Sequence, residues 1–396
     1  MQKCFNKANI YILAWCVYST QGILFPKGTL FTQLLVIVLL LVSLYYIFVA
    51  NTRYKLPVYF IGLNILLAMF TIYGVYLMIG GYDPAEYAIP VDSFGYLKNI
   101  LISLTPIYPF YVFSREGLID EKFLSMWLVV LIGLTIANYY EKQKELLYAV
   151  LLRKSNREEF TNNVAYDFLA LVPLCVFLYK KPIIQYIALG VCMLFIFMAM
   201  KRGAVFIGVI SLILFIWNNL KKISLTKKIG MLILSTILLF SGYLFVESLM
   251  QKSLFFQKRV ESTMEGNSSG RDVLYGRFAD YFWNETSSLQ YVLGSGANAT
   301  LKIYKNYAHN DWLEIAVNQG LLGICVFCLY WFFFLKNVFS RCIGFREKFA
   351  LQLILIALFL MTIFSMSYTC VGYVTGLVLG YSLSQERKHE QIIYSN

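Results

Sequence analysis

Residues 30–50 have the sequence LFTQLLVIVLLLVSLYYIFVA, a run of 21 residues without a charged side chain. An α-helix rises about 1.5 Å per residue, so about 20 apolar residues are needed to cross the hydrocarbon core of a membrane. The run therefore predicts a transmembrane helix, and its composition is the template for the rest of the chain.

Similar apolar runs recur along the whole chain, which is 59% hydrophobic and only 14% charged. Soluble domains are about 45–50% apolar and about 25% charged, so the composition excludes a disordered chain, a disulfide-stapled secreted module and an ordinary soluble enzyme. We predict an all-α polytopic membrane protein, with 1–396 as a single transmembrane domain. The twelve predicted spans are 8–25, 30–50, 56–80, 98–113, 122–138, 164–179, 182–200, 203–217, 229–247, 310–335, 349–366 and 368–384.

The positive charges predict the orientation of these spans. The net charge of +12 comes from 34 Lys and Arg residues against 22 Asp and Glu residues. Short cytoplasmic loops are enriched in Lys and Arg, and placing both termini in the cytoplasm puts 18 of the 34 on that side. The short outer loops then hold only Lys27, Lys98, Lys201 and Arg202. Topology thus accounts for most of the charge, and a nucleic-acid partner is not needed.

Two outer loops are long, at 139–163 and 248–308, and long loops escape the orientation rule. Their basic residues have two interpretations: they are solvated loop surface, or they form an outward basic basin for an anionic ligand. Neither loop contains a cysteine, so we expect no disulfide framework there. No phosphate-binding loop, dinucleotide motif or metal-ligand motif is present, so we expect no metal and no cofactor.

The stretch with the most candidate catalytic side chains lies at the end of the second long loop. It contains SGRDVLYGRFADYF (269–282), VLGSGANAT (292–300) and NYAHNDWLEIAVNQGLLG (306–323). The chain has two histidines, and His309 is the outward one; Asn310, Asp311 and Glu314 follow it. The two acidic residues could instead cap a helix. The glycines at 320 and 323 could serve close helix packing.

A second feature is the turn at Lys201 and Arg202, which interrupts an apolar run. These residues lie in a short outer loop, where Lys and Arg are normally avoided, and a charge that defies this bias at the membrane boundary is a functional candidate. Arginine grips phosphate oxygens in a bidentate fork. Snorkelling of both side chains to the lipid headgroups is the structural alternative.

These motifs resemble the signature region of the bacterial O-antigen ligase and polymerase superfamily, polytopic enzymes with a long periplasmic loop and a GT-C-like membrane fold. The run from His309 to Gly323 is the most specific part, and the K-R-G-A at Lys201 resembles the family's S-R-G-A-like turn, with Lys in place of Ser. The family uses two outward arginines and one histidine. The matching positions here are Arg202, Arg271 and His309.

The resemblance implies an inverting, metal-independent glycosyltransferase whose donor is a glycan on undecaprenyl pyrophosphate. The arginines would stabilise the pyrophosphate leaving group, and the neutral imidazole of His309 would accept the proton of the acceptor hydroxyl. A chain-length regulator or a flippase are further partners that the resemblance implies. The substrate-binding candidates that would assist are Arg277, Lys201, Asn310, Asp311, Glu314 and Tyr275.

The sequence of residues 271–323 looks like that of surface-polysaccharide polymerases. The resemblance therefore favours a polymerase of lipid-linked O-antigen or capsular repeat units at the periplasmic face of the bacterial inner membrane. A ligase that transfers the glycan to lipid A–core or another acceptor is the first alternative. A polysaccharide transporter or flippase is the second. Carriers place charges near the bilayer midplane and show related halves, whereas here the charges lie at the outer rim and no repeat is evident.

Overall fold

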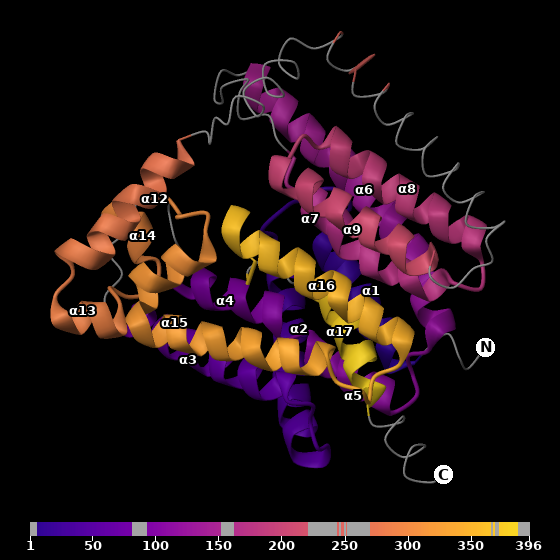
Figure 1. The fold of residues 1–396 in the computed structure, drawn as a ribbon, viewed down its shortest axis with the longest axis horizontal. Coiled ribbons are helices and arrows are strands. Elements are labelled where there is room, and N and C mark those ends of the chain that lie inside the picture. The colour runs from indigo at the N-terminus through magenta and orange to yellow at the C-terminus, as the bar shows by residue number, and fades with distance from the viewer. Residues whose placement is uncertain are drawn as a thin grey trace. The chain divides into compact units, whose positions relative to one another are not determined.

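The fold is that of a computed structural model (Figure 1), which describes residues 6–80, 93–151, 162–220, 244, 247–248, 251, 270–365, 367–368 and 372–386. Among these residues the regular secondary structure is helical, and one isolated bridge joins Gln21 to Phe25. The all-α prediction is therefore confirmed for the described part of the chain.

The helices follow one another along the chain with short connections in most places. In chain order they are α1 (Lys7–Ser19), α2 (Leu30–Arg53), α3 (Tyr59–Ile79), α4 (Ser93–Leu104), α5 (Ile107–Arg115), α6 (Glu121–Leu151), α7 (Ala165–Leu171), the 3₁₀-helix η3 (Val172–Leu178), α8 (Pro182–Met198), α9 (Arg202–Leu220), α12 (Arg271–Asp280), the π-helix η4 (Tyr281–Glu285), α13 (Ser288–Leu293), α14 (Ala299–Ile303), α15 (Asp311–Val338), α16 (Phe345–Phe364) and α17 (Gly372–Ser384).

Six of the described helices are long and apolar enough to cross a membrane. A twelve-span count stays a prediction, and the predicted span 229–247 lies almost entirely outside the described residues. The six spans are Leu30–Arg53, Tyr59–Ile79, Glu121–Tyr148, Arg202–Asn219, Asp311–Val338 and Phe345–Phe364, with Ala165–Leu178 and Pro182–Met198 as shorter apolar helices.

Proline explains where two predicted spans differ from the structure. The span predicted at 98–113 is two helices, because α4 ends at Leu104 and Pro106 caps α5; the residue before a proline disfavours the helical conformation. The span predicted at 164–179 changes from α-helix to 3₁₀-helix at Val172, next to Pro173, where the proline removes a helical donor.

The two long outer loops contain more helix than their composition indicates. α6 continues to Leu151, through the first half of the 139–163 loop, and its surface carries Lys142–Glu145 and Lys144–Glu141 ion pairs three residues apart. Pairs at this spacing stabilise a helix by a few tenths of a kcal/mol each. The described end of the 248–308 loop folds into α12, η4, α13 and α14, and residues 252–269 lie outside the description.

The chain forms two compact units. The first holds residues 1–124 and 270–396, and the second holds residues 125–269. In the first unit α3 and α15 pack closely at Gly62, where an added Cβ would lie 3.0 Å from the Cα of Tyr330. α17 approaches α5 in the same way at Gly380. Small residues at helix contacts let backbones come together, as is usual in membrane bundles.

In the second unit α8 and α9 are joined by a short turn whose Met200 has φ 55°. The backbone N–H of Asn162 donates to the carbonyl of Ala199 (3.0 Å), and the Tyr139 hydroxyl donates to the carbonyl of Met198 (3.2 Å). These bonds fix the turn that precedes Arg202, the first residue of α9.

Candidate functional site

Three predicted site residues meet at the C-terminal end of α16. Arg271 and Tyr275 lie one turn apart on α12 and therefore on one face of it. The Arg271 guanidinium donates to the carbonyl of Phe364 (2.8 Å). The Tyr275 hydroxyl lies 3.1 Å from both the carbonyl of Ile363 and the carbonyl of His309, so its one proton is shared between these two acceptors. α12, His309 and the end of α16 are thus tied together by backbone carbonyls.

His309 has a backbone conformation that is uncommon for residues other than glycine. Its φ is 53°, in the left-handed region that costs a non-glycine residue about 1 kcal/mol. Such strain persists where the surroundings over-determine it. Here the preceding residue, Ala308, donates its N–H to Glu314 Oε2 (2.7 Å), and the following residue, Asn310, caps α15 by accepting from the N–H groups of Trp312 (3.0 Å) and Leu313 (3.2 Å).

The carboxylate of Glu314 is the anchor beneath His309. Glu314 is 1% exposed, and it accepts hydrogen bonds from the Thr300 hydroxyl, from Asn318 Nδ2 (3.0 Å) and from the Ala308 N–H. Asn318 in turn accepts from the Thr300 N–H (3.2 Å). These contacts indicate that Glu314 positions Ala308, the residue before His309, from inside the protein.

Asp311 holds the other side of the site. Its side chain is fully buried and accepts from the Ser367 N–H (2.8 Å to Oδ2 and 3.1 Å to Oδ1) and from the Ser367 hydroxyl. Next to it, the indole N–H of Trp312 donates to the Thr362 hydroxyl (3.0 Å), and Asn310 Nδ2 lies 3.5 Å from the Ile363 carbonyl. The first turn of α15 thus fixes the segment that leaves α16.

Residues Gly294, Ser295 and Gly296, which we call the G-S-G motif, fit into a break in α15. Gly320 has φ 67° and ψ −161°, and Gly294 has φ 78° and ψ 177°, a region that is essentially restricted to glycine. Such a residue interrupts the helical ladder. The carbonyls of Val317 and Asn318, just before the break, accept from the N–H groups of Ser295 (2.8 Å) and Gly296 (3.0 Å).

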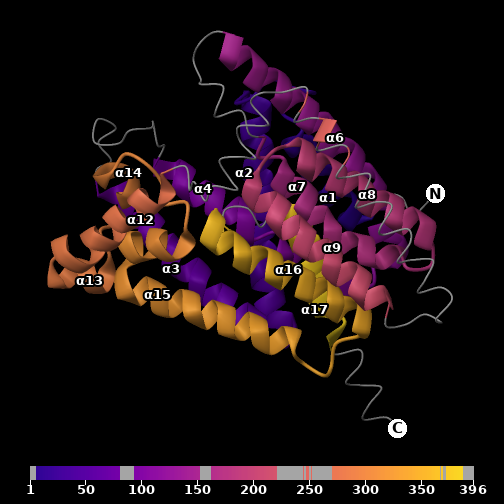
Figure 2. The ribbon, with the colours of Figure 1, turned by 45° about the horizontal axis from the view of Figure 1, so that its top comes forward.

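A small apolar core supports these polar contacts. Phe278 of α12, Ala299 of α14, Ala308 just before α15 and Val317 within α15 are buried against one another. Leu274, Tyr281, Ile303, Tyr304 and Leu313 pack around them. Figures 1 and 2 show the orange helices α12, α13 and α14 gathered around the beginning of α15. The apolar residues of this stretch therefore build a platform for His309.

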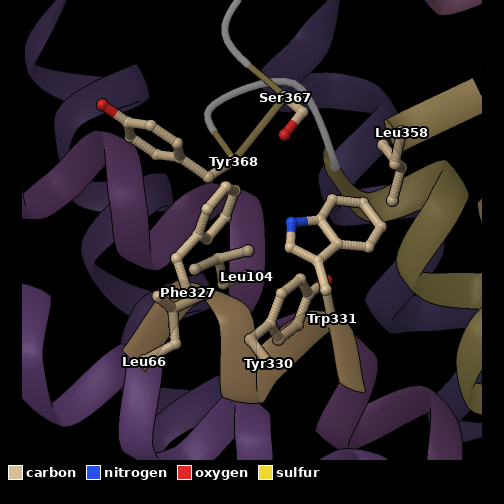
Figure 3. Close-up of a pocket in the computed structure, with 8 residues that line it drawn as sticks. All are labelled: Leu66, Leu104, Phe327, Tyr330, Trp331, Leu358, Ser367 and Tyr368. Carbon is tan, nitrogen blue, oxygen red and sulfur yellow. The ribbon is translucent and has the colours of Figure 1, made fainter. Parts of the chain in front are cut away.

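A cavity lies beside Ser367 (Figure 3). Its walls are aromatic and leucine side chains apart from Ser367, and the indole nitrogen of Trp331 faces the segment that carries Ser367 and Tyr368. The lining residues are Leu66, Leu104, Phe327, Tyr330, Trp331, Leu358, Ser367 and Tyr368. The candidate spans α3, α15 and α16 contribute to this lining, so an apolar space among them borders a segment that Asp311 positions.

The other predicted residues have different surroundings. Arg277 is exposed on α12, and its position, six residues after Arg271, puts it on a different face of the helix. Lys201 and Arg202 are half-buried at the start of α9 and belong to the second unit. Within the described residues no three His, Cys, Asp or Glu side chains cluster as metal ligands would.

Tyr275 keeps its proton at neutral pH. Burial raises the pKa of its hydroxyl above the usual value, and the neighbouring Arg271 guanidinium acts in the opposite direction. Burial raises the pKa of Tyr307, near Glu314, in the same way. Tyr275 therefore acts as a hydrogen-bond donor between α12, His309 and α16.

Several site residues were not predicted from the sequence. Thr300 and Asn318 complete the Glu314 network, and Ser367 is the partner of Asp311. The carbonyls of Ile363 and Phe364 receive the α12 side chains. Backbone carbonyls carry no sequence signal, and Ser367 lies 56 residues from Asp311, so only the fold brings these groups together.

Replacing Glu314 with glutamine is expected to lower the stability of the protein. The glutamine amide keeps the shape of the carboxylate but has an NH2 donor in place of one acceptor oxygen. That donor would face the donor groups around position 314, and a buried donor without a partner costs about 1–3 kcal/mol. The measurement is the apparent melting temperature of the purified protein in detergent. Glu285→Gln, at an exposed glutamate of η4, is the matched control. Equal melting of Glu314→Gln and the control would contradict the anchoring role.

Comparison with known proteins finds a family match over part of the chain. The model of the O-Antigen ligase family matches residues 187–328, which include all nine predicted site residues, and no curated protein matches the chain. The family and the six apolar helices together indicate a multi-pass membrane protein with a glycosyltransferase-like activity of O-antigen ligase or polymerase type. The match therefore supports membership of the chain in the O-antigen ligase and polymerase superfamily, which its motifs resemble.

Proposed function

We propose that the protein polymerises lipid-linked oligosaccharide repeat units, of O-antigen or capsular type, at the periplasmic face of the bacterial inner membrane. Donor and acceptor are glycans carried on undecaprenyl pyrophosphate. The observation that carries the proposal is the meeting of Arg271, Tyr275 and His309 at one end of α16, inside the region matched by the family. Both termini lie in the cytoplasm in this proposal.

The charge that develops on the leaving group gives the arginines their proposed role. As the anomeric C–O bond breaks, negative charge develops on the pyrophosphate, and pre-placed donors lower the energy of that charge. A guanidinium has five N–H donors, so Arg271 can be anchored on Phe364 and still grip phosphate oxygens. Arg202 is proposed for the same task, with Lys201 and Arg277 as further positive charges near the glycan phosphates.

His309 is proposed as the general base. Its imidazole takes the proton of the acceptor hydroxyl, the hydroxyl oxygen bonds to the anomeric carbon, and undecaprenyl pyrophosphate leaves with the electrons of the broken bond. One displacement inverts the anomeric centre, and arginines supply the charge stabilisation, so the proposed reaction is inverting and metal-independent. Asn310 contacts substrate, while Asp311 and Glu314, being buried, act as positioning residues.

A ligase that transfers the glycan to lipid A–core or another acceptor uses the same donor chemistry, and the matched family is described as O-Antigen ligase. This is the second candidate function. A polysaccharide transporter is the third, and a chain-length regulator or flippase would be a partner in the polymerase case. The acceptor that the protein uses separates the first two.

The test is to incubate the purified protein in vesicles with lipid-linked repeat units. We expect a ladder of lengthened lipid-linked glycans. Transfer only when lipid A–core or another acceptor is added would replace the polymerase by the ligase. Movement of intact lipid-linked sugar across the vesicle, with no new product, would contradict both enzymes and identify a carrier.

A further inference from the structure

The segment that carries the G-S-G motif has an apolar edge that is exposed among the residues that the structure describes. Leu289 of α13 is 69% exposed and Trp283 of η4 is 67% exposed, with Val292 and Leu293 also exposed. We call these four residues the α13 edge. Leu289, Val292 and Leu293 are spaced i, i+3 and i+4, which places them on one face of α13.

Such a stripe normally faces a protein core. A helix with apolar residues at this spacing buries that face, but α13 has no buried residue. The edge is also held firmly: the Ser287–Gln290 capping box starts α13, and Tyr291 stacks on Phe282 with ring centroids 5.0 Å apart. An ordered apolar face of this kind marks a site of contact with an apolar neighbour.

The edge is continuous with the outer surface of two candidate membrane spans. The Tyr73 hydroxyl of α3 donates to the carbonyl of Leu293, and Gly294 lies against Gly320 of α15. Directly after Gly320, Leu321 and Leu322 are both exposed. Figure 2 shows α13 beside the beginning of α15.

The position along α3 of the contact between Tyr73 and Leu293 indicates that the neighbour of the α13 edge is lipid. α3 continues for six residues beyond Tyr73, about 9 Å. Its exposed residues there are still apolar and include Tyr76 and Ile79, which is 79% exposed. The contact therefore lies within the exposed apolar band of a candidate membrane span, not at its end. Tryptophan, such as Trp283, is the residue that favours the boundary between hydrocarbon and headgroups.

We propose that the α13 edge is embedded in the membrane, at the boundary between acyl chains and headgroups, as an interfacial anchor of the site-bearing segment. The occupant of the apolar face is the lipid bilayer itself. The anchor holds residues 281–296 against the membrane and, through the contact of Gly294 with Gly320, sets the height of His309 above it. This inference does not depend on which glycan transfer the protein performs.

The test uses Trp283 as a fluorescent reporter in the full-length protein. Wild type and Trp283→Phe are reconstituted in phosphatidylcholine vesicles with or without bromine on the acyl chain near the headgroup, and their difference spectrum isolates Trp283. We expect blue-shifted emission that loses most of its intensity in brominated lipid and little to aqueous iodide. Two further variants are controls, each measured as a difference from wild type. Trp217→Phe isolates an exposed tryptophan on the candidate span α9, and Trp331→Phe isolates a tryptophan that is only 4% exposed.

A second reporter guards against a local effect of Trp283. Leu289→Trp in the Trp283→Phe background moves the indole onto α13 and should show the same quenching by brominated lipid. Quenching of both reporters by iodide and not by brominated lipid would overturn the proposal, because the edge would then face water. Quenching by neither agent would also overturn it, because the edge would then be covered by protein, such as a second copy of the chain.

Discussion

Replacing His309, Arg271 or Arg202 with alanine is expected to abolish glycan transfer while the protein stays folded in the membrane. A general base contributes about 10²–10⁴-fold to a rate, and one donor to a developing oxyanion contributes about 10²–10³-fold. In the proposed mechanism the imidazole and each guanidinium have separate tasks, so we expect each loss to be severe alone. The measurement is the glycan product formed from lipid-linked donor by equal amounts of purified variants.

The histidine needs a control that separates its backbone from its side chain, because its φ is 53°. Asparagine tolerates this left-handed conformation better than most residues, so His309→Asn keeps the local fold and removes the base. We expect it to melt like the wild type and to be as inactive as His309→Ala. Full activity in either variant would exclude His309 as the base.

Arg271 needs a similar separation, because it also ties α12 to the Phe364 carbonyl. Arg271→Lys keeps one positive charge and one donor for that carbonyl but loses the fork that grips a phosphate. A folded but inactive Arg271→Lys supports the phosphate role. Arg341→Ala, at an exposed arginine after α15, should be fully active. Restoration of activity by lysine would exclude the bidentate grip, because lysine supplies the charge without the fork.

The sequence indicated the site better than its architecture. The stretch from Arg271 to Gly323 stood out because polar, glycine and aromatic residues interleave there, and the structure brings Arg271, Tyr275 and Asn310 to one end of α16. The acidic residues were harder to interpret. Asp311 and Glu314 follow the pattern of a first helical turn, but their actual acceptor roles depend on partners such as Ser367 that are distant in the chain.

The spans were predictable where hydropathy is uniform and less so elsewhere. The template run 30–50 is α2, which begins at Leu30 and ends at Arg53. The first predicted span, 8–25, is helical only as far as Ser19, because the chain turns at Gly22 with φ 99°. Apolar composition predicts that a segment leaves water, but backbone breaks depend on single glycine and proline residues.

The break at Gly320 shows this limit most clearly, because glycines at 320 and 323 also fit simple helix packing. What decides is the backbone conformation: Gly320 and Gly294 both adopt angles reserved for glycine, and they meet without side chains between them. No periodicity in the sequence announces such a pair. The G-S-G and N-Q-G motifs are therefore two halves of one contact.

Replacing Gly320 with alanine is expected to destroy that contact and to destabilise the protein strongly. An ideal Cβ at this position would lie 2.4 Å from the N atom of Gly294 and 2.6 Å from the carbonyl of Val292, so backbone must move. The strained conformation and the overlap each cost about 1–3 kcal/mol. We expect a large drop in the apparent melting temperature in detergent and loss of glycan transfer.

Gly133→Ala is the matched control. Gly133 lies within α6, an added Cβ there meets no atom within 4 Å, and alanine favours a helix over glycine by about 1 kcal/mol. Its melting temperature should equal or exceed that of the wild type. If Gly320→Ala melted like Gly133→Ala, α15 could run unbroken through this position. The carbonyls of Val317 and Asn318 would then bond within the helix, and Ser295 and Gly296 would have no reason to lie where they do.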